Sequence, residues 1–138
     1  MIKLFFNKRG SGKSKELMNL ANSESEVING HSVYIDDNEK RIFSIDKAIR
    51  FVSMKEYDVK SYTEFLAFIC GILSNDYDIE NLYIDNFSKI VKDFDTELLA
   101  YYLDDLNKLS KKHNVNVYIN AHDDGKIVPD KAKEYISA

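Results

Sequence analysis

The segment Asn7-Lys-Arg-Gly-Ser-Gly-Lys-Ser14 combines glycines, cations and a hydroxyl, which together are suited to holding an anion. Gly10 and Gly12 reach backbone angles closed to other residues, so successive N–H groups can turn inward around a phosphate. Lys13 supplies a point charge for the β and γ oxygens, and Ser14 a hydroxyl for Mg²⁺. A helix beginning at Ser14 directs its positive end to the same place. The segment therefore predicts a nucleoside triphosphate site that uses Mg²⁺.

The flanking residues favour a phosphate-binding loop over an ordinary polar turn. The apolar run Ile2–Phe6 predicts a buried strand before the loop, and good helix formers follow it from Glu16 to Ala21. The pattern G-x-x-x-x-G-K-[ST] has Asn7 at its first glycine position, a mild change because asparagine tolerates left-handed backbone angles. The residues predicted to contact the nucleotide here are Asn7, Lys8, Arg9, Gly10, Ser11, Gly12, Lys13, Ser14 and Lys15.

Strand and helix patterns alternate along the rest of the chain. Short apolar runs typical of buried parallel strands occur at Ser32–Asp36, Leu82–Asp85 and Val115–Asn120. Apolar residues recur at spacings of three and four in Tyr62–Leu73 and Leu99–Leu109, which predicts two amphipathic helices. Four weaker expectations are Thr96 as a helix N-cap, a short helix at Asp46–Val52, an extra strand at Gly125–Pro129 and a terminal helix at Asp130–Ala138.

This alternation predicts an α/β fold, doubly wound, with a mainly parallel sheet of four to five strands and helices on both faces. Residues 1–138 fit one nucleotide-binding domain of ordinary size. In such a fold, ligands bind at the carboxyl ends of the strands. The polar residues at those ends are therefore the ones to consider for chemistry.

Asp85 ends an apolar strand and has the profile of a carboxylate that supports Mg²⁺ together with Ser14. The alternative is a turn or helix-capping aspartate. Many ATPases place a glutamate directly after such an aspartate to activate water, whereas this chain has Asn86. Because an amide cannot accept a proton in that way, either hydrolysis is weak or the base comes from another strand.

The chain resembles the RecA-like ATPases, which include recombinases and ring helicases. Four blocks carry the resemblance, in the family's order: Gly10–Ser14, Val33–Glu39, Leu82–Phe87 and Leu106–His122. It implies a P-loop NTPase fold and a catalytic acid just beyond the second strand, for which we rank Glu39, then Asp37, then Asp36. It also implies that Asn120, at the end of the last strand, senses the γ-phosphate.

Composition limits the other expectations. The chain has 44% hydrophobic and 30% charged residues, which are ordinary globular values, and no apolar stretch long enough to span a bilayer. We expect a cytoplasmic protein without a membrane partner. A net charge of −4 gives no general attraction to DNA, so a DNA contact would be local, within an assembly formed by self-association or with a partner protein. Two alternatives to an ATPase stay open: a non-hydrolysing nucleotide-dependent switch or adaptor, and a small P-loop kinase.

Overall fold

A five-stranded sheet in which every strand runs parallel forms the centre of the protein, in a computed structural model that describes residues 1–8 and 10–137. The predicted α/β class and parallel sheet are confirmed. Arg9, which we expected at the phosphate site, lies outside the described residues. The spatial order of the strands is β1-β5-β4-β2-β3, and their bounds are β1 (Ile2–Asn7), β2 (His31–Asp36), β3 (Ile49–Ser53), β4 (Ile79–Ile84) and β5 (Asn116–His122).

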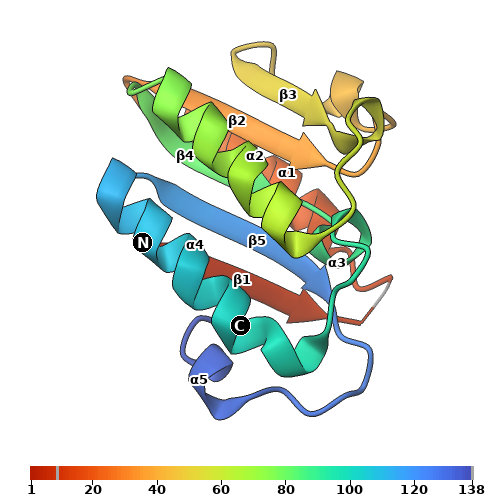
Figure 1. The fold of residues 1–138 in the computed structure, drawn as a ribbon. Coiled ribbons are helices and arrows are strands. Elements are labelled where there is room, and N and C mark those ends of the chain that lie inside the picture. Colours follow the sequence, from red (N-terminus) through yellow and green to blue (C-terminus); the bar gives the residue numbers. More distant parts are fainter. Residues whose placement is uncertain (9, 138) are drawn as a thin grey trace.

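Helices cover both faces of this sheet (Figure 1). Helix α1 (Lys13–Ser25) packs on one face, where Leu17 and Ala21 join a small buried cluster. Helices α2 (Tyr62–Asn75) and α4 (Leu99–His113) pack on the other face over a larger core. Because both faces are covered, the central strands are almost wholly apolar, as parallel strands usually are. None of the described helices is long and apolar enough to cross a membrane.

Three tyrosines on neighbouring strands form a ladder beneath α1, and their pairing shows how the polar strand ends are aligned. Tyr34 of β2 pairs in register with Tyr83 of β4, and Tyr83 with Tyr118 of β5. The rings are stacked, with centroids 6.0 Å and 5.1 Å apart. Side chains two residues apart on a strand share one face. The register therefore places Asp36, Asp85 and Asn120 side by side at the carboxyl edge of the sheet.

Two predictions about the middle of the chain were wrong. The segment expected as a helix at Asp46–Val52 is a turn followed by β3, because Ile49, Phe51 and Val52 are strand formers that pair with β2. Thr96 is not the N-cap of α4. It begins the 3₁₀ turn Thr96–Leu98, is buried, and donates its hydroxyl to Asp124 Oδ1 at 3.0 Å.

The last described residues also differ from expectation. No strand forms at Gly125–Pro129; Gly125 has a φ of 83°, which interrupts an extended run. The expected terminal helix is limited to α5 (Asp130–Lys133). The chain then turns and pairs with the outer edge of β1: the Leu4 N–H donates to Tyr135 O, and the Ser137 N–H to Leu4 O, both at 2.8 Å. The short helix α3 (Phe87–Ile90) completes the fold and directly follows the polar end of β4.

Candidate functional site

The loop between β1 and α1 is shaped by two glycines. Gly10 and Gly12 have φ angles of 83° and 80°, in the left-handed region that other residues rarely adopt. A Cβ atom at either position would meet no neighbour within 4 Å, so the backbone angle, and not crowding, requires glycine. Gly12 is the N-cap of α1, and the Glu16 N–H bonds its carbonyl at 3.2 Å. The positive end of α1 therefore faces the space above the loop.

That space is a cavity of about 620 Å³. Its lining includes every described residue that we predicted to bind the nucleotide, from Asn7 and Lys8 through Gly10–Lys15 to Asn120. Cations come from several elements: Lys8, Lys13 and Lys15 from the loop and α1, Arg41 from the segment after β2, and Lys89 from α3. A concave surface with this charge is suited to a polyanion.

Asp85 lies behind the lining of this cavity, directly after β4, with a fully buried side chain. Its Oδ1 accepts hydrogen bonds from the Ser14 hydroxyl at 3.0 Å, the Asn86 N–H at 2.9 Å and Asn120 Nδ2 at 2.8 Å. Its Oδ2 accepts one from the Tyr34 hydroxyl at 2.8 Å. Donors from four elements therefore hold the carboxylate in one orientation.

Ser14 and Asp85 fit Mg²⁺, which prefers hard oxygen ligands and commonly uses a loop hydroxyl and one carboxylate. Ser14 lines the cavity, and its hydroxyl lies 3.0 Å from Oδ1 of Asp85 behind it. The Lys13 side chain is only 19% accessible, and its ammonium lies 2.9 Å from Glu16 Oε2. Glu16 thus neutralises the cation that we predict to contact phosphate.

A second buried carboxylate, Asp36, lies beside Asp85 and also has no accessible surface. Its Oδ1 accepts from Asn86 Nδ2 at 2.8 Å and from the Asp37 N–H at 2.7 Å, and Arg41 Nη1 lies 3.4 Å from its Oδ2. Burial away from water raises the pKa of Asp36 to about 7, and the neighbouring Asp85 charge acts in the same direction. Asp36 therefore holds a proton more readily than an ordinary aspartate.

Asn86 connects this carboxylate to the cavity. Its backbone is left-handed, with a φ of 56°, at the N-cap of α3. Its amide nitrogen donates to Asp36, while its Oδ1 lies 3.2 Å from Nε2 of His122 at the end of β5. Both Asn86 and His122 line the cavity. The residue that replaces the expected glutamate thus occupies a bonded position between Asp36 and the ligand space.

The structure places the three candidate bases differently. Asp36 lies directly behind Asn86. Glu39 is exposed on the segment after β2, with its Oε1 3.7 Å from Lys55 Nζ, and it does not line the cavity. Asp37 borders a separate small cavity with Lys55 and Lys92, and its Oδ1 is buried without a hydrogen-bond partner among the described residues.

Sequence reasoning missed several residues of the site. Met18 and Asn19 lie one turn into α1, Ser44 lies in the 3₁₀ turn Ile42–Ser44, and Lys89 lies in α3; all four line the cavity. The position of Lys89 in the sequence could have indicated it, because Lys89 follows the end of β4 by a few residues in the same way that Lys13 follows β1. The contact of Tyr34 with Asp85 needed the register of β2 and β4, which sequence reasoning did not provide.

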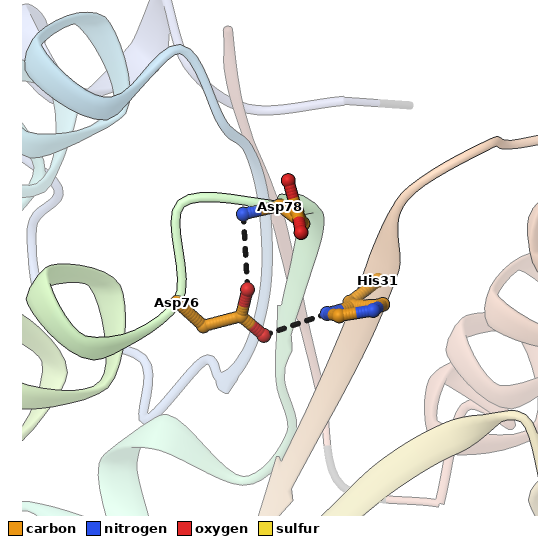
Figure 2. Close-up of side chains that lie close together, drawn as sticks. All are labelled: His31, Asp76 and Asp78. Carbon is orange, nitrogen blue, oxygen red and sulfur yellow. Dashed lines mark hydrogen bonds and ion pairs between the residues drawn. The ribbon is translucent and has the colours of Figure 1, made fainter.

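A different group of possible metal ligands lies at the opposite, amino-terminal edge of the sheet. Figure 2 shows His31 Nδ1 bonded to Asp76 Oδ2 at 2.7 Å, while Asp76 Oδ1 accepts from the Asp78 N–H at 2.9 Å. The hydrogen bond and the charge of Asp76 raise the pKa of His31 and so favour its protonated form. His31 and Asp78 are exposed, and acidic groups of this kind are common at protein surfaces, so a surface ion pair accounts for the group.

Comparisons with known proteins add no relative. No protein-family model matches the chain, and a search of curated proteins finds no significant match. A functional assignment therefore depends on the loop, the cavity and the two buried carboxylates.

Proposed function

We propose that this chain binds ATP together with Mg²⁺ as a minimal RecA-like P-loop ATPase. The observation that carries the proposal is the hydrogen bond of 3.0 Å between Ser14, which lines the cationic cavity above the glycine loop, and Asp85, which lies directly behind it. The loop amides and Lys13 would bind the phosphates, and Ser14 with Asp85 would hold the ion. When bound, Mg²⁺ neutralises charge on the β and γ oxygens.

The order of the strands supports the RecA-like form of the proposal. Strand β5 lies between β1 and β4, so the end of β5 is placed between the loop and the metal carboxylate. Asn120 accordingly bonds Asp85 at 2.8 Å and lies 3.4 Å from Ser14 Oγ. The resemblance assigns this position to sensing of the γ-phosphate, and a side chain in contact with both metal-site residues suits that role.

One observation favours the second candidate, a non-hydrolysing nucleotide-dependent switch. Asn86 takes the place next to Asp85 where a water-activating acid is expected, and its amide is bonded on both sides, to Asp36 and His122. Asp36 has a pKa suited to a general base, but Asn86 separates it from the cavity. Turnover therefore requires either movement of Asn86 or an acid from the segment that carries Asp37 and Glu39.

The test is a panel of nucleotides, each with and without Mg²⁺, measured by thermal shift. We expect ATP with Mg²⁺ to raise the melting midpoint more than ADP, GTP or ATP in chelator. A midpoint that no nucleotide moves would reject the proposal. A larger shift with GTP than with ATP would show that the preferred nucleotide carries guanine and not adenine.

Phosphate release, measured on the same samples, separates the ATPase from the switch. If the ATPase assignment holds, the protein releases phosphate from ATP alone or with single-stranded DNA. One of the variants Asp36→Asn, Asp37→Asn and Glu39→Gln, the one that removes the catalytic base, should then lower this release about 10²–10⁴-fold while ATP binding persists. Binding without release, at high protein concentration and with DNA, supports the switch. Transfer to a small-molecule acceptor in place of water would favour the kinase.

A further inference from the structure

Tyr34 makes a contact with the metal carboxylate that differs from all the others. Its hydroxyl donates to Asp85 Oδ2 at 2.8 Å, whereas Ser14, Asn120 and the backbone N–H of Asn86 all donate to Oδ1. The bond from Tyr34 adds a constraint at the second oxygen, so both oxygens of the carboxylate are held in place.

Packing around Tyr34 fixes the position of its ring. The side chain has no accessible surface, and its ring stacks between Phe51 and Tyr83 with centroids 6.0 Å from each. Its hydroxyl is the donor in the bond to Asp85 Oδ2. The ring is fixed by packing, and the hydroxyl therefore has a fixed position relative to Asp85.

Other tyrosines of the same ladder lack this contact. Tyr83 is equally buried and stacks directly on Tyr34, but its hydroxyl accepts from Asn81 Nδ2 at 3.2 Å, at the other end of the strand from Asp85. Ladder packing is thus shared by both residues, whereas contact with the metal carboxylate distinguishes Tyr34. Tyr83 is therefore a matched control in the same layer.

We propose that Tyr34 is a positioning residue of the magnesium site, which orients Asp85 for the ion that accompanies the nucleoside triphosphate. This inference rests on the proposed function. Residues that hold a metal ligand in place without touching the metal typically contribute 10- to 100-fold in metal affinity. Because Asp85 keeps its bonds at Oδ1, the effect of losing Tyr34 belongs at the lower end of that range.

The experiment titrates Mg²⁺ at fixed ATP in wild type, Tyr34→Phe and Tyr83→Phe, with ATP in chelator as the metal-free arm. In Tyr34→Phe we expect the Mg²⁺ concentration for half-maximal thermal stabilisation to rise about tenfold, with metal-free ATP binding within twofold of wild type. Tyr83→Phe should keep the wild-type Mg²⁺ dependence. The phenylalanine ring fills the same space, and circular dichroism of the nucleotide-free variants, at a temperature below their melting, establishes that they are folded.

A double-mutant cycle with Asp85→Ala tests whether Tyr34 acts through that carboxylate. In the Asp85→Ala background, Tyr34→Phe should cause no further change in Mg²⁺ dependence. Three results would overturn the inference while the wild type still binds Mg-ATP. They are additive changes in Mg²⁺ dependence in the double mutant, a Mg²⁺ titration of Tyr34→Phe that matches wild type, and an equal change in Mg²⁺ dependence in Tyr83→Phe. A wild type that binds no nucleotide would overturn the proposed function as well, so the two failures are distinguishable.

Discussion

At the scale of single residues, the charges of the candidate site pair with one another. Lys13 is paired with Glu16 one turn along α1, at 2.9 Å. The pair is partly exposed and worth little by itself. A triphosphate offers Lys13 several oxygens in a less hydrated place, so we expect the pair to open when nucleotide binds.

Lys13→Ala should therefore remove stabilisation by nucleotide and leave the fold intact. At a ligand concentration 100 times the dissociation constant, wild type should gain about 2.7 kcal/mol in unfolding free energy. The variant, at the same concentration, should gain less than about 1 kcal/mol, as measured by urea unfolding with and without Mg-ATP. Lys108→Ala, on the exposed surface of α4, is the control and should behave as wild type.

Asp36 predicts a pH dependence of stability. Its pKa rises from the ordinary 3.8 to about 7 in the folded protein, so between these values the folded state binds more protons than the unfolded state. The unfolding free energy should then fall as pH rises through this window, by at most about 1.4 kcal/mol per pH unit, and stay level above it.

Asp36→Asn should remove this decline, because the amide does not titrate. The measurement is the urea midpoint at intervals from pH 4 to pH 8. Asp58→Asn, an exposed aspartate after β3, is the control that should keep the wild-type slope. Parallel pH profiles for Asp36→Asn and wild type would show that Asp36 is already ionised across the window.

At the scale of elements, the β1–loop–α1 unit depends on the left-handed backbone of Gly12. This residue both ends the loop and caps the helix, so its φ of 80° sets the direction in which the loop N–H groups face. Gly71 offers a contrast, since it lies within α2 in ordinary helical geometry with open space around it.

Gly12→Ala and Gly71→Ala should change stability in opposite directions. An alanine at Gly12 is strained in the left-handed region and should cost about 1–2 kcal/mol, with weaker stabilisation by Mg-ATP. An alanine at Gly71 should add about 0.5–1 kcal/mol through helix propensity and leave nucleotide binding unchanged. Urea unfolding of both variants, with and without nucleotide, tests the pair. A destabilised Gly71→Ala variant would contradict the helix argument.

At the scale of the whole molecule, β1 is held on both sides by segments distant in sequence. β5 pairs with it along its full length, and the turn after α5 bonds its outer edge through Leu4. The outer edge of β1, the edge strand that leads into the glycine loop, is therefore partly covered by these last described residues.

Ser137→Pro tests this edge. It removes the N–H that bonds Leu4 O at 2.8 Å, and should lower the unfolding free energy by about 1 kcal/mol, the usual net worth of a hydrogen bond. Ser137→Ala keeps the N–H and should match wild type. Hydrogen exchange at the Leu4 amide, bonded to Tyr135 O, should be faster in the proline variant. Equal stability of the two variants would show that the edge contributes nothing.

The sequence by itself determined the local features of this protein. Gly10, Gly12, Lys13 and Ser14 specify a loop because their backbone freedom, charge and hydroxyl act within a few residues. The apolar runs around Tyr34, Tyr83 and Tyr118 specify buried strands, and the three- and four-residue spacing in Tyr62–Leu73 specifies a helix. Where local signals were weak, as at Asp46–Val52, pairing with β2 overrode the helical interpretation.

Tertiary structure alone decided which polar residues meet. Strand order and register are set by packing between segments far apart in the chain, and a shift of one residue would turn Asp85 to the other face of the sheet. The observed register brings Tyr34 and Asn120 to Asp85 from two neighbouring strands and buries Asp36 behind Asn86. It also leaves Glu39, first among our predicted bases, exposed outside the cavity, with its Oε1 3.7 Å from Lys55 Nζ.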